Sequence, residues 1–148
     1  MKNNSIIIKE PRTIEELEAY YLLRYQILRE PWNQPFGSEK DEQENISIHA
    51  MAYYNEKNIL GVCRLQFNSN EEAQLRYMAV AKNNQGFGIG KKLIEYMEER
   101  TRIEGTKKIV LHARENALPF YEKCGYRIIE KSYLMWGEIQ HYLMEKKL

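Results

Sequence analysis

Alternating apolar positions and β-branched residues predict four strands and one helix in the first 80 residues. The run SIIIKE at residues 5–10 is typical of a short strand that ends before Pro11. Thr13 followed by Glu16 matches a capping box, and apolar residues then recur at helical spacing as far as residue 28. We expect three further strands to pair antiparallel in chain order, with NEKN as the turn between the first two. They lie at residues 46–54, 59–67 and 72–80.

After Val80 the spacing of apolar residues changes from strand-like to helical. One face of the predicted helix is formed by Ile89, Leu93, Met97 and Thr101. Gly105 is suited to end this helix, and a buried strand is expected at residues 107–113. Because a strand, helix and strand in succession normally form a right-handed crossover between parallel strands, the sheet is expected to be mixed.

The last third of the chain predicts a short helix and two more strands. Asn116 is suited to cap the helix, and Gly125 is suited to end it. The two strands are expected at residues 126–134 and 138–148. The whole pattern predicts one α/β (α+β) domain over residues 1–148, with a mixed, mostly antiparallel sheet of about seven strands and flanking helices.

One long segment, residues 30–44, has no periodicity. It contains two prolines, one glycine and many carboxylates, which predicts a surface loop. Long loops in compact domains tend to be functional.

Composition and charge narrow the class of protein. The chain has 148 residues, 43% of them hydrophobic, and its formal charge is +1, so we expect neither nucleic acid nor a membrane as partner. Cys63 and Cys124 match neither a zinc spacing nor a disulfide framework, which favours a reducing compartment and no bound metal. The apolar run of residues 5–8 is too short for a signal-peptide core, so a cytoplasmic location is expected.

The segment NNQGFGIGKKL, residues 83–93, carries the main chemical signal. Glycines between a strand and a helix leave free backbone N–H groups at the positive end of the helix dipole, which favours an anion such as phosphate. A dinucleotide-binding fingerprint is excluded because Lys91 stands where its third glycine is needed. A Walker A motif is excluded because Gln85 and Lys92 replace its glycine and its Ser or Thr.

The pattern that fits is Q-x-x-G-x-G, formed by Gln85, Gly88 and Gly90. It resembles motif A of the GNAT superfamily, the acyl-CoA-dependent N-acetyltransferases. The segment LHARENALPFYEKCGY, residues 111–126, resembles the second signature of that family. The order of elements predicted above is also similar to the GNAT fold over nearly the whole chain.

The resemblance implies acetyl-CoA as cosubstrate. Its pyrophosphate is expected on the N–H groups from Gln85 to Lys91, where glycine at 86, 88 and 90 lets phosphate approach the backbone. The residues concerned are Gln85, Gly86, Gly88, Gly90 and Lys91. The main chain of Met78 and Val80 is expected to hold the pantetheine arm, with an N–H near Val80 facing the thioester oxygen. Asn116 matches a position that contacts the cofactor arm, although its capping role alone would also explain it.

The resemblance also implies a catalytic acid, whereas the base stays open. Tyr121 matches the tyrosine that protonates the leaving thiolate; the alternative is an aromatic residue packed beside Phe120. Residues 74–80 contain no carboxylate that could act as the base. His112 and, less well, His49 are candidates, and for each the alternative is a strand histidine with its hydrogen bonds satisfied.

Charged residues near the expected site have two interpretations each. Arg76 and Arg114 would bind cofactor phosphate or a substrate carboxylate, or would be ordinary surface charges. Carboxylates of the long loop would suit a cationic amine, although a solvated loop explains most of them. These carboxylates are Glu39, Asp41, Glu42 and Glu44.

We therefore expect an enzyme that moves an acetyl group from acetyl-CoA to a primary amine of a small molecule or peptide by direct attack on the thioester. The alternative is a CoA-binding sensor or interaction module that keeps the fold without turnover. Homodimerisation is common in the family and is a further interaction that the resemblance implies.

Overall fold

Seven strands form one mixed sheet in the computed structural model, which describes residues 6–55 and 58–148. The strands are β1 (Ile6–Lys9), β2 (Ile48–Tyr54), β3 (Asn58–Phe67), β4 (Ala73–Val80), β5 (Lys108–Arg114), β6 (Arg127–Met135) and β7 (Ile139–Lys147). Their order in the sheet is β1-β2-β3-β4-β5-β7-β6. Only β4 and β5 pair in parallel, which confirms the predicted mixed, mostly antiparallel sheet. Ser5 of the predicted first strand and residues 56–57 of the predicted NEKN turn lie outside the described residues.

Three helices cover the two faces of the sheet. They are α1 (Ile14–Leu28), α2 (Ile89–Ile103) and α3 (Leu118–Lys123). α1 packs its Tyr20 and Leu23 against Met51 and Val62 on one face. α2 packs against the alternate residues of the same strands on the other face, as the period of two along a strand requires. Within the described part of the chain, no helix is long and apolar enough to span a bilayer.

The local signals read from the sequence mostly hold. Thr13 and Glu16 form the predicted capping box at the start of α1. Gly105 and Gly125 follow α2 and α3 in the left-handed conformation, with φ of 79° and 96°. Asn116 was expected to cap α3, and this is wrong: it lies in a 3-10 turn (Glu115–Ala117), and Ala117 occupies the cap position without a side-chain hydrogen bond.

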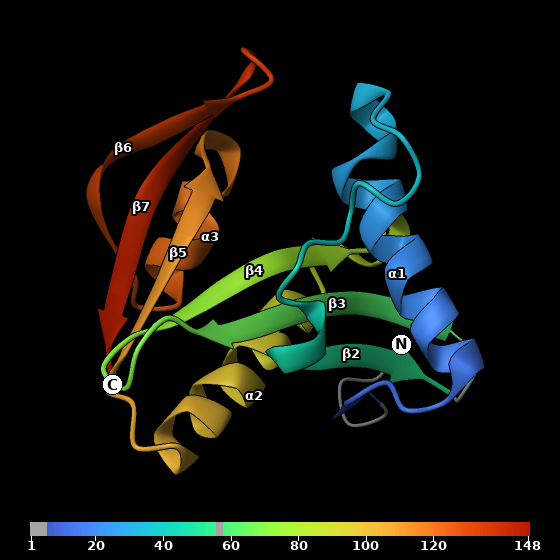
Figure 1. Ribbon diagram of the computed structural model, residues 1–148, viewed down its shortest axis with the longest axis horizontal. Helices are drawn as coiled ribbons and strands as arrows, with labels where there is room; N and C mark the ends of the chain where they lie inside the picture. The colour runs from blue at the N-terminus through green and yellow to red at the C-terminus, as the bar shows by residue number, and fades with distance from the viewer. Residues whose placement is uncertain (1–5, 56–57) are drawn as a thin grey trace.

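β4 and β5 pair over a short stretch and then diverge. The register joins only Ala73 to Ile109 and Gln74 to Val110. Further along β4, the register with β3 shifts between Val62 and Arg64, and Tyr77 adopts a φ of +56°. A β-bulge of this kind bends its strand and increases the local twist. Figure 1 shows the result: β4 and β5 start near the C-terminus and separate into two arms of the sheet.

The segment after α1 was expected to be a solvated loop, and this is wrong for most of its carboxylates. Asp41 and Glu44 each lie 2.6 Å from Nη1 of Arg64, and Glu44 lies 3.0 Å from Nη1 of Arg24. Both arginine side chains are fully buried, and Glu39 is also buried. Because a buried charge is costly without a partner, the loop folds back and supplies the two countercharges.

Candidate functional site

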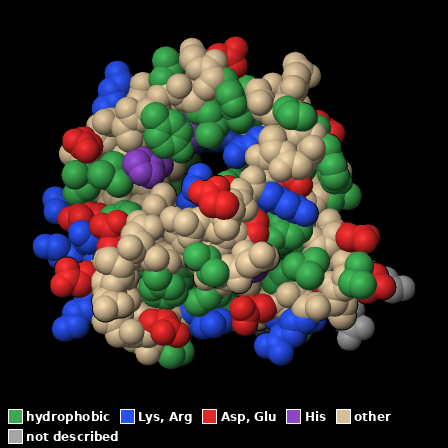
Figure 2. All heavy atoms as spheres, in the orientation of Figure 1, with side chains coloured by type: hydrophobic (Ala, Val, Ile, Leu, Met, Phe, Trp, Pro, Cys, Tyr) green, Lys and Arg blue, Asp and Glu red, His purple; other side chains and the backbone are tan. Residues whose placement is uncertain are grey.

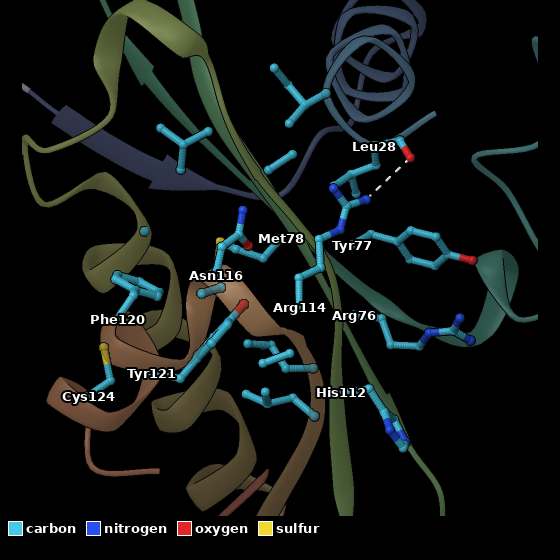
Figure 3. A pocket seen from close by; sticks show the side chains of 18 of the residues that line it. Leu28, Arg76, Tyr77, Met78, His112, Arg114, Asn116, Phe120, Tyr121 and Cys124 are labelled. Carbon is cyan, nitrogen blue, oxygen red and sulfur yellow. Dashed lines mark hydrogen bonds between the residues drawn. The ribbon is translucent and has the colours of Figure 1, made fainter. Parts of the chain in front are cut away.

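A cavity of about 1110 Å³ lies where β4 and β5 diverge. Its walls come from the end of α1, nearly the whole of β4, the glycine loop and the start of α2, the second half of β5, α3 and the β6–β7 hairpin. Figure 3 shows side chains from both strands in this region, with Arg76, Tyr77 and Met78 from β4 and His112 and Arg114 from β5. The loss of pairing between β4 and β5 therefore creates the cavity. Residues from both faces of the sheet line it.

The glycine loop forms the end of the cavity at the start of α2. Gly86 and Gly88 have φ of 90° and 79°, and Gly88 is the N-cap of α2 without any side-chain cap. In the described part of the chain, nothing accepts a hydrogen bond from the amides of residues 85–91. A Cβ atom at either glycine would meet no protein atom within 4 Å. Free amides, open space and the positive end of a helix dipole fit a diphosphate well.

Gly90 also has a packing role that the sequence did not predict. A Cβ atom there would lie 2.9 Å from Cζ of Phe120 on α3. The absence of a side chain at Gly90 therefore lets α2 and α3 pack closely at the cavity wall. The side chain of Gln85 also has a role that the sequence did not predict, since its Nε2 donates a hydrogen bond of 3.2 Å to the carbonyl oxygen of Val80 and ties the loop to the end of β4.

Other expected cofactor residues line the same part of the cavity. Met78, Val80, Lys91 and Asn116 all border it. The side chains of Met78 and Val80 pack against the main core, so their backbone is what they can offer a ligand. In Figure 3, Met78 and Asn116 lie on the same side of the gap as Tyr121.

Tyr121 projects from α3 into the cavity and is only 8% exposed. Its ring packs against Phe120 and Tyr126, with centroid distances of 5.0 and 6.1 Å. Burial raises the pKa of the phenol above its ordinary value. Tyr121 is therefore protonated at neutral pH and is a proton donor rather than a base.

His112 lies on the opposite face of β5 from the core residues Leu111 and Ala113. Its Nδ1 is buried and has no hydrogen-bond partner within the described chain. Burial and the nearby charge of Arg76 lower the pKa of the imidazole below 6.5. His112 is therefore neutral at pH 7 and has a nitrogen that can accept a proton.

His49 differs from His112 in every respect that matters for catalysis. Its Nδ1 lies 2.8 Å from the hydroxyl of Tyr20, and its Nε2 lies 2.7 Å from the carbonyl oxygen of Glu44. It does not line the cavity. Both ring nitrogens of His49 thus have hydrogen-bond partners. This agrees with the alternative that His49 is a strand histidine with its hydrogen bonds satisfied.

Three arginines border the cavity on the face that carries His112. Arg76 and Arg114 were candidates from the sequence, whereas Arg29 was missed. Arg76 pairs with Asp41 at 3.2 Å. Arg29 Nη1 and Arg114 Nη2 both donate to the carbonyl oxygen of Leu28, at 2.9 and 3.5 Å. The sequence holds no signal for Arg29, because its place in the site depends on contact between the end of α1 and a strand 86 residues away.

Acidic residues are absent from the described walls of the cavity. Three of the loop carboxylates that the sequence raised as a site for a cationic amine, Glu39, Asp41 and Glu44, are paired with arginines or buried. Among the residues that the structure covers, no three His, Cys, Asp or Glu side chains form a group that could hold a metal ion.

Comparisons with known proteins agree with this geometry. Residues 23–148 match the family model of the acetyltransferase (GNAT) domain. The chain is 29% identical over 132 residues to the uncharacterized N-acetyltransferase YjcF of Bacillus subtilis (strain 168), covering 89% of this chain and 93% of that protein.

Solved structures share the fold at lower identity. A GNAT family acetyltransferase from Elizabethkingia anophelis with acetyl-CoA bound superposes with a TM-score of 0.72 at 20% identity, covering 99% of this chain and all of that one. An aminoglycoside 6'-N-acetyltransferase complexed with coenzyme A superposes with a TM-score of 0.78 at 18% identity, covering 95% and 96%. Since the family model matches most of its length, the chain belongs to the GNAT family of acetyltransferases.

Proposed function

We propose that this chain acts as one catalytic domain that moves an acetyl group from acetyl-CoA to a primary amine of a small molecule or peptide. The observation that carries the proposal is the row of free amides at residues 85–91, at one end of a cavity that continues between β4 and β5 to Tyr121. Two proteins of the same fold hold CoA or acetyl-CoA in their solved structures, which supports the choice of ligand.

The first part of the proposal concerns how acetyl-CoA is held. The amides of Gln85, Gly86, Gly88, Gly90 and Lys91 would bind its pyrophosphate. The backbone of Met78 and Val80 would hold the pantetheine arm along β4, where pairing with β5 has ended. Asn116 would contact the same arm from the start of α3.

The second part concerns the chemistry. When bound, acetyl-CoA supplies the acetyl group as a thioester, and the neutral amine attacks its carbonyl carbon. An N–H near Val80 would stabilise the negative charge that develops on the carbonyl oxygen. Nδ1 of His112 would accept the proton that the amine loses, and the hydroxyl of Tyr121 would give a proton to the departing thiolate. The two groups line the same cavity from the two faces of β5.

Calorimetry with acetyl-CoA, followed by measurement of free thiol over a panel of amines, tests this proposal. We expect saturable binding of acetyl-CoA and thiol release with at least one amine. Binding without thiol release would identify a CoA-binding module instead. Failure to bind any CoA ester would exclude both functions.

We also propose a homodimer and a cytoplasmic location. β6 is an edge strand with exposed Ile128, Ile129 and Leu134, which are suited to contact a second copy. The free thiols of Cys63 and Cys124 favour a reducing compartment. Sedimentation equilibrium checks the first point, since a monomer at micromolar concentration would contradict it.

A further inference from the structure

We infer that the acceptor amine carries an anionic group, a carboxylate or a phosphate, which Arg29 and Arg114 bind at the end of the cavity opposite α2. The inference rests on the proposed acetyl transfer and names the class of acceptor. It differs from the alternative raised by the sequence, in which acidic loop residues attract a cationic amine.

The charges around the cavity have one sign. Among its described lining residues are five Lys or Arg and no Asp or Glu. Lys91 and Lys123 belong to the start of α2 and the end of α3, beside the proposed pyrophosphate site. The remaining three, Arg29, Arg76 and Arg114, lie on the face of His112. Figure 2 shows a hollow near the middle of the molecule with blue Lys or Arg and purple His side chains along its edge and red carboxylates just outside it.

Two of these three arginines lack a countercharge. Arg76 is paired with Asp41, but within the described residues neither Arg29 nor Arg114 lies within 4 Å of a carboxylate. Hydrogen bonds hold both side chains in place. Each donates to the carbonyl oxygen of Leu28, and Nε of Arg29 also donates to the carbonyl oxygen of Ser38 at 3.1 Å. Each keeps further N–H groups that these bonds do not use.

Aromatic rings fix the planes of both guanidinium groups. Arg114 lies over the ring of Trp32 at 4.3 Å, and Arg29 lies over Trp136 at 5.4 Å from the ring centroid. The rings of the two tryptophans also contact each other, with centroids 5.8 Å apart. Arg29 is only 8% exposed. The N–H groups that these contacts leave unused on Arg29 and Arg114 can bind a carboxylate or a phosphate through two parallel hydrogen bonds.

The uncompensated charge of this pair has an electrostatic cost. Burial, together with repulsion from Arg76 and Arg24, lowers the pKa of Arg29. Burial and repulsion from Arg29 lower the pKa of Arg114. A bound anion would relieve this repulsion, whereas a polycationic acceptor would increase it.

The position of Arg114 relative to His112 suits an anionic amine. The two residues lie two positions apart on β5, so both stand on the same face of the strand, and both line the cavity. An amine whose anionic group is bound by Arg114 would have its nitrogen on the side of the cavity that carries His112.

Matched pairs of acceptors test the inference on the wild-type protein. One arm compares phenylalanine with phenethylamine and lysine with cadaverine; the second compares phosphoethanolamine with ethanolamine. Hydrogen bonds to a charged group contribute enough that kcat/KM should be about 10- to 100-fold higher for the anionic member of a responding pair. A preference within the first two pairs would identify a carboxylate as the bound group, and a preference within the third pair would identify a phosphate.

Substitutions then assign the effect to the arginine pair. Arg114→Gln should bring the ratio within the responding pair close to one, while Arg114→Lys should restore part of it. The matched control is Arg102→Gln on α2, whose side chain is 50% exposed and outside the cavity, and which should keep the wild-type ratio. Arg29→Gln should act like Arg114→Gln. If it does not fold, the two Arg114 variants still decide the question.

The outcomes separate this inference from the proposed function. Equal rates within every pair, or faster turnover of the members that lack the anionic group, would refute the anionic acceptor and leave acetyl transfer intact. A ratio that survives in Arg114→Gln would place the anion elsewhere and refute the assigned site. Binding of acetyl-CoA without thiol release from any amine would refute the proposed function itself, and the acceptor class with it.

Discussion

Replacing Gly88 by alanine separates the two roles that this glycine has in the proposed mechanism. Gly88 caps α2 with a φ of +79°, and its missing Cβ faces open space rather than protein. Alanine therefore costs backbone strain, and its methyl group would also project into the space assigned to the pyrophosphate. Gly105 provides a matched control, because it also has a φ of +79°, follows the other end of the same helix and has no atom near its Cβ position.

The expected magnitudes differ between the two variants in a defined way. An alanine in the left-handed region costs ~1–2 kcal/mol, so both variants should lose that stability and melt a few degrees lower. Only Gly88→Ala should move the pyrophosphate off the loop amides. A hydrogen bond to a charged group contributes ~1.5–3 kcal/mol, so the loss of one should weaken acetyl-CoA binding by about 10- to 150-fold.

Thermal unfolding and calorimetric titration with acetyl-CoA measure the two effects separately. We expect similar shifts in Tm for Gly88→Ala and Gly105→Ala, and a weaker Kd for Gly88→Ala alone. Wild-type affinity in Gly88→Ala would show that the pyrophosphate does not lie on this loop. An equal loss of affinity in both variants would show that general destabilisation of α2 explains the effect.

Three further predictions concern the proton donor, the base and the buried ion pairs. Tyr121→Phe should lower kcat about 100-fold with little change in acetyl-CoA affinity. The control is Tyr126→Phe, which alters the neighbouring buried ring outside the cavity and should keep the wild-type kcat. A wild-type kcat in Tyr121→Phe would show that another group donates the proton. Because burial and a nearby arginine lower the pKa of His112, the neutral base accumulates as the pH rises, so kcat should rise with pH to a plateau, with its midpoint below the ordinary imidazole value of 6.5, and His112→Gln should lack that limb. An unchanged profile in His112→Gln would exclude it as the base. Burial would raise the pKa of Asp41, but its bonds to Arg64 and to a backbone amide outweigh this and lower it to about 2, so stability should be complete above its ordinary value of 3.8 and fall as the pH drops toward 2. Asp41→Asn should cost ~3 kcal/mol in urea unfolding at pH 7; a loss below 0.5 kcal/mol, on the order of an ordinary surface substitution, would contradict the role given to this ion pair.

Local features of the sequence predicted the strands, the helices and the glycine-rich turn before α2. The capping box at Thr13, the left-handed glycines at 105 and 125 and the alternation along β2 and β3 depend on neighbouring residues alone. These signals fix each element within one or two residues. The same is true of the free amides at residues 85–91, because a glycine-rich turn before a helix is enough to expose them.

Contacts between segments that are distant in the chain could not be predicted from the sequence. The divergence of β4 and β5 goes with a bulge at Tyr77, which no periodicity predicts. The ion pairs of Asp41 form with arginines 23 and 35 residues away, so its loop was taken for a solvated one. Arg29 reaches the site only through the packing of α1 beside β5, and its importance is visible only in the structure.

A crystal structure of the protein with acetyl-CoA tests the proposed binding mode most directly. We expect the pyrophosphate oxygens within hydrogen-bond distance of the amides of residues 85–91, the pantetheine arm along β4 at Met78 and Val80, and the thioester sulfur beside the hydroxyl of Tyr121. A pyrophosphate bound away from the start of α2, or a thioester directed away from the gap between β4 and β5, would contradict the mechanism.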